Sequence, residues 1–109
     1  MPNKSLRILI ADSDTEQALK IERALNQAGY FRVAPLRGND ALKGLRDAKA
    51  GDFDLLLISQ KMAGGAGVDP AHYHRENAQF CHIRIYQDAD ALIANLVALM
   101  KNIDPPERI

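Results

Sequence analysis

The chain has 109 residues, enough for one folded domain and too few for two ordinary ones, so we expect residues 1–109 to form a single domain. Fourteen Lys and Arg residues balance fourteen Asp and Glu residues, and this zero formal charge gives no electrostatic reason to expect a nucleic-acid or membrane partner. The single cysteine, Cys81, cannot form an internal disulfide bond, which fits a reducing compartment, and we expect a cytoplasmic protein.

The chain begins with a strand-like segment and a helix-like segment. Residues 6–11 are rich in apolar β-forming side chains and stop at a polar turn, which predicts a buried strand. Asp14 and the glutamine three positions later form a capping signal, and Gly29 is a typical helix terminator. The apolar residues between them recur at helical spacing and predict one inward face: Ala18, Ile21, Leu25 and Ala28.

The middle of the chain predicts two further strands around a weaker helix. Residues 30–34 look like a second strand that Pro35 ends, and residues 39–50 look like a helix that Gly44 weakens. Residues 54–58 are apolar without polar alternation. This pattern indicates a strand in the middle of a sheet that helices cover on both faces.

The last part of the chain continues the alternation. Residues 60–67 hold three glycines in four positions and predict a mobile loop, and a short helix should follow over residues 71–78. Residues 80–86 predict a fourth strand, and residues 91–102 a final helix that Asp88 or Asp90 caps. Strands that alternate with helices favour an α/β fold with a parallel sheet and helices on both faces.

The chemistry of such a fold should lie at the carboxyl ends of the strands, where parallel sheets present their functional crevice. The polar residues that follow or close the first, third and fourth predicted strands are therefore candidates for one site: Asp12, Ser13, Asp14, Ser59 and Tyr86.

Three segments together resemble response-regulator receiver domains. Residues 7–14 read Arg-Ile-Leu-Ile-Ala-Asp-Ser-Asp, residues 38–42 read Gly-Asn-Asp-Ala-Leu, and residues 54–67 resemble the third strand and the glycine-containing loop of the family. Their order and separation carry the resemblance, which extends over about residues 6–86. It implies a flavodoxin-like sheet, here shortened from five strands to four.

The resemblance also implies roles that this chain partly lacks. The phosphate-accepting aspartate of receivers falls on Ser59, and their two Mg²⁺-binding acids fall on Asp12 and Ser13. Asp14 matches an acidic position that usually caps the helix, and the hydroxyl residue of the fourth strand falls near Tyr86 or Gln87. Mg²⁺ requires anionic oxygen ligands, and a serine hydroxyl is a weak nucleophile without a base. We therefore expect a pseudo-receiver that is not an enzyme and holds no cofactor or metal.

The end of the chain leaves alternatives open. If a helix and the last strand are missing, the strand at 80–86 becomes a sheet edge, the interpretation we prefer; otherwise it replaces the fifth strand. The final helix carries two neighbouring apolar stripes, which indicates either a core that wraps further around it or an interaction surface. The candidate surface consists of Ile93, Leu96, Val97 and Met100.

These features predict a phosphorylation-independent signalling module that acts through contact with another signalling protein or with a second copy of itself. The alternative is a sensor whose crevice binds a phosphate-containing or other small ligand, with the glycine-rich loop presenting backbone N–H groups to an anion.

Overall fold

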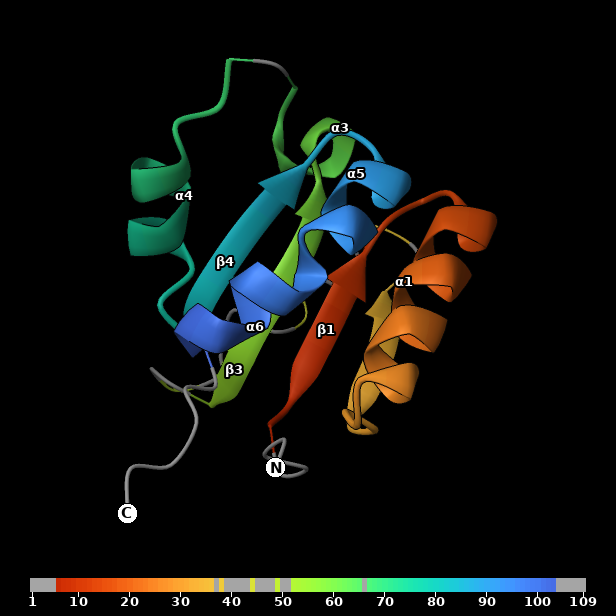
Figure 1. The fold of residues 1–109 in the computed structure, drawn as a ribbon. Coiled ribbons are helices and arrows are strands. Elements are labelled where there is room, and N and C mark those ends of the chain that lie inside the picture. Colours follow the sequence, from red (N-terminus) through yellow and green to blue (C-terminus); the bar gives the residue numbers. More distant parts are fainter. Residues whose placement is uncertain are drawn as a thin grey trace.

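Four parallel strands form the centre of the fold. The computed structural model describes residues 6–36, 38, 44, 49, 52–65 and 67–103. In these residues the strand order is β2-β1-β3-β4, and all pairs of neighbours are parallel. The strands are β1 (Ile8–Ala11), β2 (Val33–Leu36), β3 (Phe53–Ser59) and β4 (Phe80–Tyr86). The expected α/β fold is thereby confirmed, in a flavodoxin-like arrangement (Figure 1).

The two inner strands, β1 and β3, hold six of the nine largest fully buried side chains among the described residues. β3 lies between β1 and β4, and its residues from Leu55 to Ile58 are inaccessible to solvent. Because side chains of a strand alternate between the two faces, an apolar run of this kind requires cover on both sides of the sheet. The sequence pattern predicted this position for the third strand correctly.

One face of the sheet is covered by α1 (Thr15–Gln27), α5 (Ala89–Ala94) and α6 (Leu96–Ile103) (Figure 1). The Asp14 side chain caps α1 by accepting hydrogen bonds from the N–H groups of Glu16 and Gln17, as the capping signal predicted. Gly29 follows the helix with a φ of 102°, a conformation that suits glycine. Ala28, expected on the inward face, is instead exposed because α1 ends before it.

The other face packs against α3 (Gln60–Ala63) and α4 (Pro70–Glu76). Asp69 caps α4, and Pro70 occupies its first turn, where the missing N–H does no harm. Buried residues of this side come from the sheet and from α3, with Tyr73 of α4 packed against them. The helix predicted over residues 39–50 lies outside the described residues, apart from single positions.

Two expected element boundaries were wrong. The second strand begins at Val33, later than predicted, and continues through Pro35. A proline is tolerated there because β2 has a sheet neighbour on one side only among the described residues, so a ladder bond can be absent at its outer side. Part of the expected loop at 60–67 is the helical turn α3, because the Ser59 hydroxyl caps it.

The final helix is also divided. We expected one helix over 91–102, but Asn95 separates α5 from α6. The Asn95 side-chain Nδ2 donates a hydrogen bond of 3.0 Å to the carbonyl of Ala91, and such local side-chain bonding competes with a regular helix. Asp88, the first of the two cap candidates, accepts from the N–H groups of Asp90 and Ala91. No helix of the described segments has the length and apolar character of a membrane span.

Candidate functional site

The carboxyl edge of the sheet brings three of the five candidate side chains together. Asp12 follows β1, while Ser59 and Tyr86 are register partners at the ends of β3 and β4. The Tyr86 hydroxyl spans the end of β3 and donates a buried hydrogen bond of 2.8 Å to Oδ2 of Asp12. The predicted convergence of the strand ends therefore includes a direct contact between residues 74 positions apart.

The carboxylate of Asp12 is bonded through both of its oxygens. Oδ2 accepts from Tyr86, and Oδ1 accepts from the backbone N–H of Asp14 at 2.8 Å. Only 3% of Asp12 is exposed to solvent. Hydrogen bonds to a carboxylate are stronger than those between neutral groups, so each bond contributes to holding this side chain in place.

Tyr86 is held in its protonated form. Burial raises the pKa of its hydroxyl far above the usual value near 10, and the hydrogen bond to Asp12 and the negative charges of Asp12 and Asp14 raise it further. Each of these effects disfavours a phenolate: burial removes its hydration, and nearby carboxylates repel it. Tyr86 is therefore a permanent donor to Asp12 at neutral pH.

Ser59 is used in local structure. Ser59 is 8% exposed, and its Oγ accepts a hydrogen bond of 3.3 Å from the N–H of Met62 in the first turn of α3. The position that resembles the phosphate acceptor of receivers is thus a helix cap.

The remaining two candidates contribute less. Ser13 is exposed and lies outside the group of buried side chains. The Asp14 side chain faces α1 as its cap, and Asp14 hydrogen-bonds to the group through its backbone N–H. No group of three His, Cys, Asp or Glu side chains suited to a metal ion occurs within the described residues.

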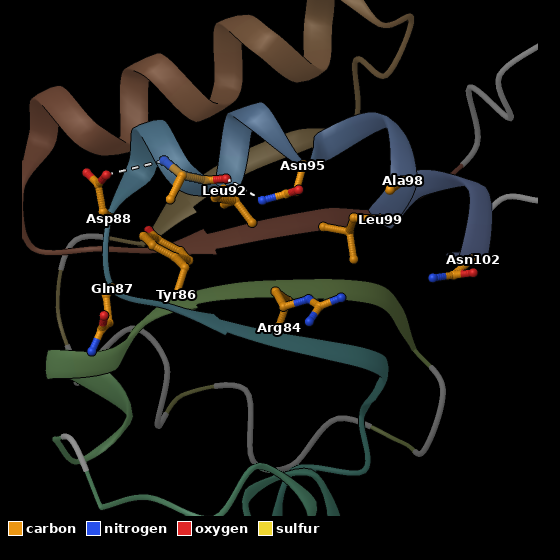
Figure 2. Close-up of a pocket in the computed structure, with 10 residues that line it drawn as sticks. Arg84, Tyr86, Gln87, Asp88, Leu92, Asn95, Ala98, Leu99 and Asn102 are labelled. Atoms are coloured by element: carbon orange, nitrogen blue, oxygen red, sulfur yellow. Dashed lines mark hydrogen bonds between the residues drawn. The ribbon is translucent and has the colours of Figure 1, made fainter.

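A second candidate site, which the sequence did not predict, is a groove between β4 and the α5–α6 pair. Its volume is about 450 Å³, and Figure 2 shows Arg84 extending from β4 beneath α6, with Asn95, Leu99 and Asn102 along the facing helices. A signal was present in β4, where His82 and Arg84 alternate with isoleucines, a pattern typical of a strand with one solvent-facing side.

The predicted interaction surface on the final helix does not form one exposed patch. Leu96 and Met100 are each only 5% exposed and belong to the core, and Ile93 is partly buried against it. Val97 alone of the four is well exposed, at 71%. The reason is that α6, which starts anew after Asn95, packs Leu96, Leu99 and Met100 together against the sheet. Of the two interpretations left open, the extended core fits this arrangement.

Comparisons of this chain with protein-family models, with curated proteins and with solved structures find no match. The resemblance to receivers therefore rests on the residues quoted above.

Proposed function

We propose that this chain is a receiver-like signalling module of two-component type that works by protein–protein contact, without phosphorylation. The observation that supports this most is the buried bond from Tyr86 to Asp12. In a receiver, the acid at this position would help to hold Mg²⁺; here both carboxylate oxygens already accept protein hydrogen bonds.

The acceptor position supports the same proposal. Phosphoryl transfer depends on a positioned nucleophile and on a cation that neutralises the charge of the phosphate. Ser59 presents a hydroxyl, a weak nucleophile without a base, and that hydroxyl already accepts the N–H of Met62. Ser13 cannot replace the second metal-binding carboxylate, because its hydroxyl carries no charge.

A fixed site suggests how such a module would signal. Phosphorylation acts in switches by shifting an equilibrium between two conformations. With Tyr86 bonded to Asp12, the carboxyl edge of the sheet is held in one arrangement. The signal would then depend on which partner protein binds the module. The module would then act as a constant docking element.

The test is incubation of the purified chain with acetyl phosphate and Mg²⁺, followed by intact-mass analysis and an amide NMR spectrum. We expect the mass and the spectrum to stay unchanged. A gain of one phosphoryl group, mapped to Asp12 or Asp14, would refute the proposal.

A thermal-shift series with phosphates and nucleotides distinguishes the sensor alternative. A ligand at 100 times its dissociation constant would add about 2.7 kcal/mol to the free energy of unfolding. A melting temperature that rises with such a ligand would favour the sensor; an unchanged melting temperature would favour the contact module.

A further inference from the structure

The outer edge of β4 is open in the described part of the chain. β4 is seven residues long and pairs with β3 on one side, while no described strand pairs with its other side. An edge strand presents a row of backbone N–H and C=O groups that can pair with another strand. At its start, Phe80 is hydrogen-bonded to Asn77 and His74, so the relevant edge begins at His82.

The groove described above runs beside this edge. A second hollow of about 200 Å³ shares Arg84, Leu99 and Asn102 with it and continues toward His74 and His82. The lining therefore follows β4 on the side of α5 and α6, and it mixes aliphatic side chains with amides. Such a surface can receive alternate side chains of a strand added at the edge, since these project to one face of the sheet.

The charged side chains along the outer edge of β4 are mostly positive. Arg84 is exposed, and its side chain makes no ion pair or hydrogen bond with any residue that the structure describes. Arg75 lies on α4 in a hollow shared with His74, which adds a second cation near the start of β4. Asp88 also lines the groove, but its carboxylate caps α5 through two N–H groups.

We propose that the outer edge of β4 binds an extended segment of a partner protein as an added strand, with an acidic side chain of that segment against Arg84. This inference rests on the proposed function, and it names the surface through which the module would contact its partner. In strand addition, backbone hydrogen bonds supply affinity and the pockets for alternate side chains supply specificity. Here the specificity comes from the aliphatic groove and from the guanidinium of Arg84.

A second copy of the chain fits this edge less well. In a two-fold antiparallel pairing of β4 centred on Arg84, the two guanidinium groups would face each other. Centred one residue earlier, each Arg84 would face the imidazole of His82 in the other copy, which supplies no negative charge. Like charges directly opposite each other destabilise a strand pair, whereas opposite charges stabilise it. The charge pattern therefore favours an acidic partner segment over self-association.

The test uses a display library of random segments of about ten residues, selected on the whole chain. We expect the enriched segments to combine β-forming residues with Asp or Glu. Fluorescence anisotropy of a labelled segment should show that Arg84→Glu weakens binding about tenfold or more, as the loss of an attraction and the gain of a repulsion predict. Replacing the acid of the segment by lysine should restore binding to Arg84→Glu.

Two controls make the result specific to the edge. Arg23→Glu, which makes the same charge change on the exposed side of α1, should leave the affinity within about twofold. N-methylation of alternate amides in the segment should abolish binding, because it removes the donors of a strand ladder. Amide NMR shifts on binding should concentrate at residues 82–86.

The proposal is overturned if the library yields no binding segment, if Arg84→Glu binds the segment as well as the wild type, or if N-methylated segments still bind. Light scattering that shows a dimer dispersed by Arg84→Glu would assign the edge to a second copy instead. The outcome is separable from that of the acetyl phosphate experiment: a phosphorylated chain that still binds the segment refutes the proposed function alone, and an unmodified chain that binds none refutes this inference alone.

Discussion

Replacing Tyr86 by phenylalanine removes one hydroxyl group and leaves the ring. In the wild type this hydroxyl donates to Asp12 at 2.8 Å, and both residues are buried. The substitution Tyr86→Phe keeps the apolar contacts of the ring with the core. The change in the free energy of unfolding should therefore measure the lost hydrogen bond, together with the cost of leaving the buried Asp12 carboxylate with one donor fewer.

The expected magnitude follows from that environment. A hydrogen bond to a charged group contributes about 1.5–3 kcal/mol, and a buried carboxylate that loses a donor keeps the cost of its burial. Asp12 would retain only the N–H of Asp14. We expect Tyr86→Phe to lower the free energy of unfolding by about 2 kcal/mol, which corresponds to about 10 °C in melting temperature for a domain of this size.

Urea unfolding at neutral pH measures this loss, and a double-mutant cycle assigns it. In an Asp12→Ala background the hydroxyl of Tyr86 has lost its acceptor, so Tyr86→Phe should cost less than about 0.5 kcal/mol there. The coupling between the two positions should thus be at least about 1.5 kcal/mol. Equal losses in both backgrounds would show that the Tyr86 hydroxyl does not stabilise the protein through Asp12, and the role given to this hydrogen bond at the carboxyl edge would be wrong.

Three further predictions concern stability. The pKa of Tyr86 is raised in the folded state, so its contribution to the free energy of unfolding is complete below the unfolded pKa near 10 and declines as the pH rises beyond that value. Above this pH, the free energy of unfolding of the wild type should therefore fall more steeply than that of Tyr86→Phe, by up to about 1.4 kcal/mol per pH unit. Ser59→Ala should cost about 0.5–1 kcal/mol through the lost cap of α3, while Ser13→Ala, at an exposed position, should cost less than about 0.5 kcal/mol; similar values in urea titrations would contradict the assignment of the cap. Leu96→Ala should lower the free energy of unfolding by about 2–5 kcal/mol, and Val97→Ala by less than about 1 kcal/mol. A larger loss for Val97→Ala than for Leu96→Ala in thermal melts would contradict the assignment of Leu96 to the core.

The strands that were predicted well share a simple cause. Each carries a local strand pattern: β1 and β3 are apolar runs that are buried in the covered sheet, and β4 alternates isoleucines with His82 and Arg84. β2 was misplaced because an edge strand of four residues can include Pro35 and carries little hydrophobic signal.

The final helix shows a second limit. Its apolar spacing is compatible with one continuous helix, and the break at Asn95 depends on a side chain that bonds to the carbonyl of Ala91. Asparagine is tolerated inside helices as well as at their ends, so its type alone does not predict a break. The direction of α6 after the break then decides that Leu96 and Met100 are core residues and Val97 is not.

The candidate site was predicted in position but not in bonding. Parallel strands end at the same edge, which is sufficient to place Asp12, Ser59 and Tyr86 near each other. That Tyr86 reaches over β3 to Asp12 depends on the order of the strands and on the length of the tyrosine side chain, which no local pattern contains. The open edge and the unpaired Arg84 likewise follow from which strand ends the described sheet.

The ionisation of the Tyr86 hydroxyl is the most direct test of its buried hydrogen bond to Asp12 at the carboxyl edge of the sheet. The NMR chemical shift of the ring carbon that bears this hydroxyl differs between phenol and phenolate, and labelled tyrosine allows it to be followed as the pH rises. We predict that the Tyr86 signal keeps its phenol value through pH of about 10, where an ordinary tyrosine is half ionised. A Tyr86 signal that titrates at that ordinary value in the folded protein would contradict the buried bond to Asp12, and with it the account of a site held shut by its own side chains.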